Sequence, residues 1–101
     1  MRKQAESVSA LMKVLSHPNR LLILCLLAED ERSVGELAER VGMREAAVSQ
    51  QLAMFRQLNL VKTRRDGQTV FYALARDDLS ALMAFLYETY CPAPSPESED
   101  Q

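Results

Sequence analysis

Very few side chains in this chain are suited to catalysis or redox chemistry. Its 101 residues include two cysteines, Cys25 and Cys91, and one histidine, His17. A thiolate is the nucleophile of thiol–disulfide exchange, so the two cysteines are candidates for reaction with oxidants or disulfides. The simpler alternative is two unrelated thiols, with Cys25 packed as a small core residue and Cys91 incidental. These residue types alone leave both interpretations open.

Other patterns that carry chemistry are missing from the sequence. It contains no Cys-x-x-Cys pair, no Ser/His/Asp arrangement and no Gly-rich phosphate loop. We therefore do not expect an enzyme. One histidine and two cysteines also make a four-ligand zinc site within one chain hard to build. We expect neither a metal nor a cofactor.

A second group of candidate residues is basic. Residues 32–76 contain eight Lys and Arg against four Asp and Glu, although the whole chain has a net charge of −2. Residues 77–101 contain six acidic residues and no basic one. A basic segment inside an acidic chain predicts a local surface that binds anions. An ordinary solvated surface is the alternative, and the positions of the basic residues must decide between them.

Hydrophobic periodicity predicts the helices that position these residues. The expected helices span 5–16, 18–28, 34–41, 44–58 and 77–90. Ser33 and Glu36 have the spacing of a capping box at the start of the third helix. Gly42 breaks the chain before the fourth helix, and Asn59 is suited to the left-handed conformation that ends it. Asp77 or Asp78 is expected to cap the fifth.

The period changes to two in 60–65 and 68–74, which predicts a β-hairpin. These segments flank Asp66-Gly67, and the pair is expected to form the two-residue turn because it tolerates positive φ angles. On the fourth helix, five apolar residues are expected to face inward: Ala47, Val48, Leu52, Phe55 and Leu58.

Length and composition indicate one domain in residues 1–91. The chain is 48% hydrophobic and 26% charged, which is typical of a soluble globular protein. Residues 92–101 are Pro-rich and acidic, and we expect this tail to be disordered. No apolar run approaches the roughly 20 residues needed to cross a bilayer. We expect a cytoplasmic protein with no membrane partner.

The order of elements predicts a mainly α winged helix-turn-helix fold, α-α-α-α-β-β-α. The second helix of such a motif enters the major groove of DNA, and the hairpin would form a wing beside it. The expected partner is therefore double-stranded operator DNA. For Arg64 and Arg65, a charged edge that protects an exposed hairpin is the rival interpretation. The candidate DNA contacts are Arg44, Ser49, Gln50, Gln51, Lys62, Arg64, Arg65, Gln68 and Thr69.

Four segments of the sequence, 17–24, 33–38, 47–52 and 61–72, together carry a resemblance to a known family. Over about residues 5–91 the chain resembles the ArsR/SmtB-type winged-helix repressors. The resemblance implies a homodimer whose first and last helices form the interface. The apolar residues that would form it are Val8, Leu11, Met12, Leu15, Leu79, Leu82, Met83 and Leu86.

The sequences around the two cysteines resemble the BigR/SqrR-like branch of that family, which senses reactive sulfur species. This resemblance implies that persulfides or polysulfides act as the inducer. It also implies that Cys25 and Cys91 become joined by a disulfide, or by a bridge with inserted sulfur atoms, and that the protein then releases DNA. Alternatives on the same fold are a general peroxide switch, an HlyU-like activator and, with less support, a metal-responsive repressor.

Overall fold

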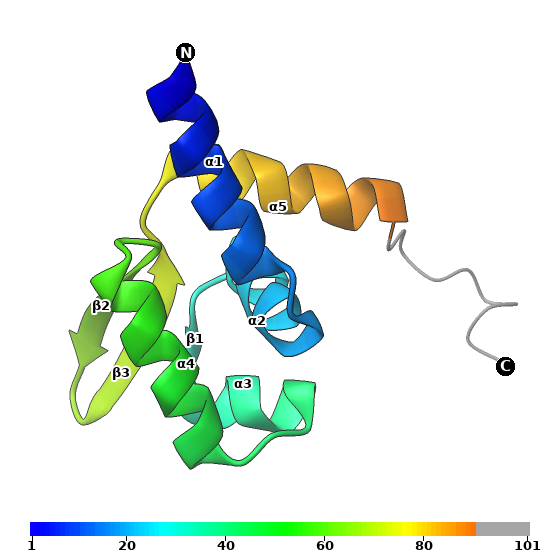
Figure 1. Cartoon of the computed structure of the whole chain (residues 1–101). Helices are drawn as coiled ribbons and strands as arrows, with labels where there is room; N and C mark the ends of the chain where they lie inside the picture. Colours follow the sequence, from blue (N-terminus) through cyan, green and yellow to red (C-terminus); the bar gives the residue numbers. More distant parts are fainter. Residues whose placement is uncertain (91–101) are drawn as a thin grey trace, which may run out of the picture.

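The structure of the protein is a computed structural model that describes residues 1–90 (Figure 1). It confirms the mainly helical winged helix-turn-helix fold and adds one short strand. Cys91 and the predicted tail, 92–101, lie outside the described residues. The elements are α1 (Arg2–Leu15), α2 (Pro18–Glu29), β1 (Arg32–Ser33), α3 (Val34–Val41), α4 (Glu45–Gln57), β2 (Val61–Asp66), β3 (Thr69–Leu74) and α5 (Asp77–Tyr90).

The core gathers around α2, which contacts α1, α3, α5 and β3. Figure 1 shows α1 and α5 at one end of the molecule and α3 and α4 at the other, with the β2–β3 hairpin beside α4. This arrangement leaves the helix-turn-helix and the hairpin together at one end. The largest fully buried side chains are Phe55, Ile23, Leu24, Leu37, Leu52, Leu79, Met83 and Val48.

The sheet has three antiparallel strands in the order β1-β3-β2. Sequence analysis missed β1, in which Arg32 pairs with Tyr72 and Ser33 pairs with Phe71. Two residues are too few to show an alternating pattern, so only the partner strand reveals this strand. The pairing joins the end of α2 and the start of α3 to the hairpin.

The hairpin turn lies one residue later than predicted. Asp66 pairs with Thr69 and belongs to β2, so the two turn residues are Gly67 and Gln68. Gly67 has a φ of 62°. Glycine with positive φ at the first of two turn residues is the arrangement of a type II′ turn. The prediction of a two-residue turn is confirmed, and the predicted pair Asp66-Gly67 is wrong.

The end of α4 explains a second wrong prediction. Asn59 has a φ of 60°, as expected for the residue that stops the helix. Leu58 was expected to face inward but is 45% exposed. Leu60 is buried instead, and its N–H donates to the Phe55 carbonyl at 2.8 Å. The left-handed residue redirects the chain, so the helical spacing no longer applies beyond it.

The start of α5 differs slightly from the predicted cap. Asp77 is the first residue of the helix, and Asp78 is the second. Both carboxylates therefore lie in the first turn, where they complement the helix dipole. The Asp78 carboxylate accepts from the Leu79 N–H at 2.9 Å and pairs with Arg76. The hydrogen bonds that Arg76 donates to the Asp78 carboxylate are the main cause of a pKa below the usual value of that carboxyl.

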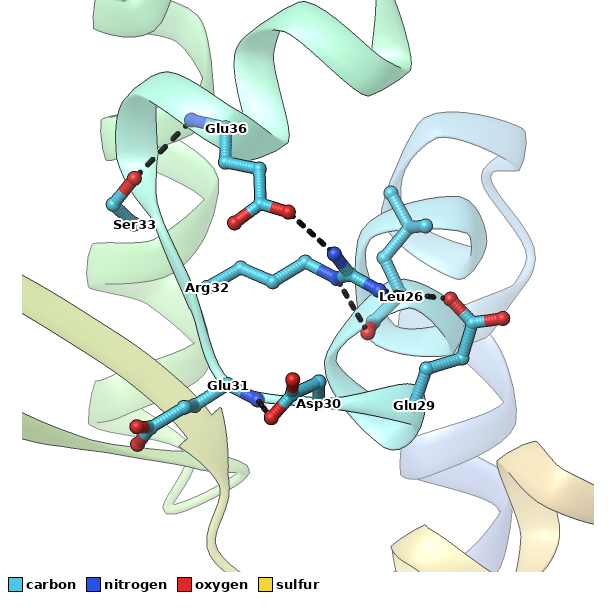
Figure 2. Close-up of polar contacts among 7 residues, drawn as sticks. All are labelled: Leu26, Glu29, Asp30, Glu31, Arg32, Ser33 and Glu36. Atoms are coloured by element: carbon cyan, nitrogen blue, oxygen red, sulfur yellow. Dashed lines mark hydrogen bonds and ion pairs between the residues drawn. The ribbon is translucent and has the colours of Figure 1, made fainter.

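A buried guanidinium connects α2 with α3 (Figure 2). Arg32 is only 8% exposed. Its Nε donates to the Leu26 carbonyl at 3.0 Å, and its two Nη atoms donate to Glu29 at 2.9 Å and Glu36 at 2.5 Å. Ser33 accepts from the Glu36 N–H, as the capping box predicts. The Glu36 carboxylate departs from that prediction because it binds Arg32 rather than reaching back to the cap.

We predict that Arg32→Ala lowers the free energy of unfolding by about 2–3 kcal/mol, because it removes three hydrogen bonds of a buried guanidinium, two of them to carboxylates. Arg32→Lys keeps the charge but loses the planar fork, so it should have an intermediate effect. Urea denaturation measures both. Arg76→Ala removes an exposed ion pair and serves as the control, for which no measurable change is expected. An equally small effect of Arg32→Ala would contradict the structural role of this residue.

Candidate functional site

The exposed face of α4 is positioned by the residues opposite it. Val48, Leu52 and Phe55 are completely buried, which holds the helix against the core. The other side of the helix is therefore turned to solvent. Arg44, at the N-cap position, and the predicted contacts Ser49 and Gln50 are exposed. Their guanidinium, hydroxyl and amide groups can donate or accept hydrogen bonds at base edges and phosphates.

Gln51 is not a full member of this face. It is half-buried, and its Oε1 accepts from Arg20 Nε at 3.1 Å. Arg20 lies in the first turn of α2, so this hydrogen bond joins α2 to α4. The structure thus gives Gln51 a partner within the protein, which the sequence did not suggest.

Five further exposed residues of α4 were not among the predicted contacts: Glu45, Ala46, Ala53, Arg56 and Gln57. Each is three, four or seven residues from Ser49 or Gln50, and this spacing was a usable signal because such positions share one side of a helix. Arg56 adds a cation, and an alanine methyl can contact a thymine methyl in the major groove.

The hairpin divides the predicted basic residues between its two faces. Side chains alternate along a strand, so Lys62 and Arg64 lie on one face and Arg65 on the other. The face of Arg65 is also that of buried Val61. Arg65 lies farther along the strand, near the turn, where it is exposed. Gln68 and Thr69 are exposed at the same tip.

Arg64 is held by a carboxylate from another part of the chain. Its Nε donates to Glu31 at 3.1 Å, and its Nη2 donates to the other carboxylate oxygen. Its guanidinium carbon lies 4.9 Å from the centre of the Phe71 ring. The hydrogen bond to Arg64 lowers the pKa of the Glu31 carboxyl, and the same bond raises the pKa of Arg64.

Ion pairs neutralise three of the eight cations in the basic segment, 32–76. Arg32, Arg64 and Arg76 each pair with acidic residues. Within residues 1–90, the other five basic residues of the segment have no ion pair within 4 Å. The unpaired positive charge therefore lies at the end of α3, along α4 and on the hairpin. These five residues are Arg40, Arg44, Arg56, Lys62 and Arg65.

Cys25 lines two neighbouring hollows that share Glu29 and Tyr87 in their linings. It is half-buried and packs against the core. The larger hollow, of about 460 Å³, is mostly apolar, and the smaller one has about 140 Å³. Tyr87 lines both, and Glu88 lines the smaller one, so the last turn of α5 lies near Cys25. The second predicted thiol, Cys91, follows Tyr90 and lies outside the described residues.

The predicted interface residues separate into two groups. Leu15, Leu79 and Met83 are buried in the core of the single chain, which corrects the expectation that they face a partner. Val8 and Met12 are 53% and 42% exposed, respectively. The remaining predicted residues, Leu11, Leu82 and Leu86, are half-buried.

Phe85 is 59% exposed and was missed by sequence analysis. It lies outside the stripe formed by Leu79, Leu82, Met83 and Leu86. The periodic pattern identified the side of α5 that faces its own core, because a helix inside one chain and a helix at an interface show the same spacing. An exposed phenylalanine beyond that stripe was the signal for a second apolar face.

Two negative findings apply to residues 1–90. No group of three or more His, Cys, Asp or Glu in this part of the chain could hold a metal ion. None of its helices alone has the length and apolar character to cross a membrane; α1 and α2 would meet both criteria as a pair, but they are bent by 102°.

The fold and the exposed faces of α4 and the hairpin define a winged helix-turn-helix regulator. Residues 17–63 match the model of the bacterial regulatory protein, arsR family. The biofilm growth-associated repressor of Agrobacterium fabrum is 43% identical over 91 residues, which are 90% of this chain and 78% of that protein. This chain belongs to the ArsR family of transcriptional regulators.

Other relatives share the fold at similar identity. The transcriptional activator HlyU of Vibrio cholerae is 41% identical over 92% of this chain and 86% of its own length. The structure of reduced HlyU has a TM-score of 0.84 and covers 90% of this chain and 96% of that one. A homodimeric winged helix-turn-helix domain from Mycobacterium bovis, 32% identical, has a TM-score of 0.74 and covers 87% and 82% of the respective chains.

Proposed function

We propose that this protein is a homodimeric, cytoplasmic repressor that binds double-stranded operator DNA and releases it when Cys25 and Cys91 react with reactive sulfur species. The observation that carries the DNA-binding part is the exposed face of α4. That face carries Ser49 and Gln50 between the cations Arg44 and Arg56. A hydroxyl and an amide group suited to base edges lie there between cations suited to phosphates.

The hairpin supports the same proposal. Lys62 and Arg65 are exposed and have no ion pair among residues 1–90, so they can meet the DNA backbone beside α4. A repressor among the similar proteins supports the direction of regulation. The similarity to HlyU, an activator, favours a second candidate, in which the same DNA contacts displace another DNA-binding protein.

The dimer is supported by the apolar residues that the single chain leaves uncovered. Val8 and Met12 on α1 and Phe85 on α5 are exposed, and both helices lie at the end of the molecule opposite α3 (Figure 1). A partner at this end leaves α3, α4 and the hairpin open to DNA. The homodimeric domain from Mycobacterium bovis has the same fold.

The thiol part is supported by the position of Cys25 beside the last turn of α5, the helix that Cys91 follows in the sequence. One thiolate takes the outer sulfur of a persulfide, RSSH, and releases RS⁻. The second thiolate attacks the cysteine sulfur of this new persulfide, which forms the disulfide and expels HS⁻. Two electrons pass from the thiols to the sulfane sulfur. One of the similar structures is that of reduced HlyU, and a protein with a distinct reduced form is redox-active.

The DNA contacts predict two different kinds of loss. Arg65→Ala should weaken binding to every duplex and make the salt dependence shallower by about 0.9 in log K against log[salt], as expected for one phosphate contact. Gln50→Ala should instead change which sequence is preferred. Selection from a random duplex library, followed by fluorescence anisotropy across a salt series, measures both. Gln4→Ala, on the exposed side of α1, is the control; a uniform loss for Gln50→Ala would contradict its role in base recognition.

Phe85→Lys should weaken the dimer at least tenfold, because it places a charge in an apolar interface. Sedimentation equilibrium measures the dissociation constant. Leu22→Lys is the matched control, because Leu22 is also partly exposed but lies on α2. Equal dissociation constants for wild type and Phe85→Lys would exclude α5 from the interface.

Treatment of the reduced protein with glutathione persulfide should remove both thiols from reaction with an alkylating reagent. Intact-mass measurement should show a monomer that has lost two hydrogens, with or without a gain of whole sulfur atoms, and that is not alkylated. Cys25→Ser and Cys91→Ser should each abolish the bridge and keep DNA bound. A hydrogen peroxide arm separates a general redox switch from a sulfur sensor. Two alkylated, unmodified cysteines would show that the pair is inert.

A further inference from the structure

Glu31 binds Arg64 in the geometry in which an arginine binds a phosphate. Glu31 lies between α2 and β1, and Arg64 lies on β2, 33 residues further along the chain. The Nε and Nη2 atoms of Arg64 donate to the two oxygens of one carboxylate. Guanidinium groups recognise carboxylates and phosphates through this same pair of parallel hydrogen bonds.

Phe71 holds the same guanidinium from a second direction. Phe71 is the cross-strand partner of Arg64 on β3, and the guanidinium carbon lies 4.9 Å from the ring centre. Arg64 thus lies on the outer face of the hairpin, with one hydrogen-bonding edge occupied by Glu31 and one flat face against an aromatic ring. Lys62, on the same face of the strand, has no such partner among residues 1–90.

This contact has two consequences for a polyanion that approaches the hairpin. The edge of Arg64 that binds Glu31 is unavailable to a phosphate while the pair is intact. The carboxylate also cancels the charge of Arg64 on a surface that otherwise carries unpaired cations. Both side chains remain accessible to solvent, so the pair is weakly held and a phosphate can replace the carboxylate.

We propose that Glu31 competes with DNA phosphate for Arg64 and so limits the affinity of the protein for DNA of any sequence. The inference rests on the proposed DNA-binding function. It adds that Glu31, a residue outside α3, α4 and the hairpin, lowers the affinity for DNA. Arg64 offers this edge to a phosphate only after it leaves Glu31. The released carboxylate then faces the DNA without its partner, which weakens the complex further.

The test compares Glu31→Gln with the wild type in the full chain. Glutamine keeps the size of the side chain and one acceptor oxygen but removes the charge. Affinity for a duplex of random sequence, measured by fluorescence anisotropy between about 50 and 200 mM KCl, should rise about three- to tenfold at low salt. The slope of log K against log[salt] should steepen by up to about 0.9, because Arg64 then neutralises one more phosphate.

Two further variants separate the effect of the hydrogen bonds between Glu31 and Arg64 from the effect of negative charge near Arg64. Asp66→Asn removes a negative charge on the same strand that also acts on Arg64, but Asp66 makes no hydrogen bond to it. It should raise affinity less than Glu31→Gln does. In an Arg64→Ala background, Glu31→Gln should lose most of its effect, which a double-mutant cycle measures. Circular dichroism and thermal unfolding establish that each variant is folded.

Unchanged or lower affinity for folded Glu31→Gln would overturn the proposal and make Glu31 a residue that positions Arg64 for DNA. An equal gain from Asp66→Asn would also overturn it, because the effect would then belong to net charge alone. If the wild type binds no duplex at 50 mM salt, the DNA-binding function itself fails, and that outcome is distinct from the other two.

Discussion

The position of one buried guanidinium determines how the other functional parts are arranged. Arg32 binds the last turn of α2 through Leu26 and Glu29 and binds α3 through Glu36. Because Arg32 lies in β1, its hydrogen bonds to both helices define the path of the short segment between them. The two residues next to Arg32 are positioned by this path: Ser33 caps α3, and Glu31 binds Arg64 of the hairpin. The helix-turn-helix and the hairpin therefore share one anchoring residue.

Charge in this protein is distributed by pairing as much as by composition. Acidic residues neutralise Arg32, Arg64 and Arg76, so the charge of these cations is used in contacts within the protein. Of the cations in 32–76 that have no ion pair within residues 1–90, four of five lie at α4 or on the hairpin. An overall negative chain can thus present a positive surface to DNA. Pairing at the hairpin tunes the strength of that surface, since Glu31 withholds one of its cations.

Cys25 and α4 are linked through the same helix. Cys25 and Glu29 both line the two hollows beside α5, and Glu29 is one of the acceptors of Arg32. Glu29 therefore belongs both to the surroundings of the thiol and to the hydrogen bonds of the residue that anchors α3. On the same helix α2, Arg20 donates to Gln51 of α4.

The sequence by itself determined the helices, the hairpin, the family and part of the exposed face of α4, because these depend on the order and spacing of neighbouring residues. Spacing alone misplaced Leu58 and the hairpin turn, and it could not distinguish the core face of α5 from the face of Phe85. Only the tertiary structure revealed β1, the bond between Arg20 and Gln51, and the pairing of Arg64 with Glu31. Those contacts join residues far apart in the chain, and which charges meet depends on the path that the packed helices impose.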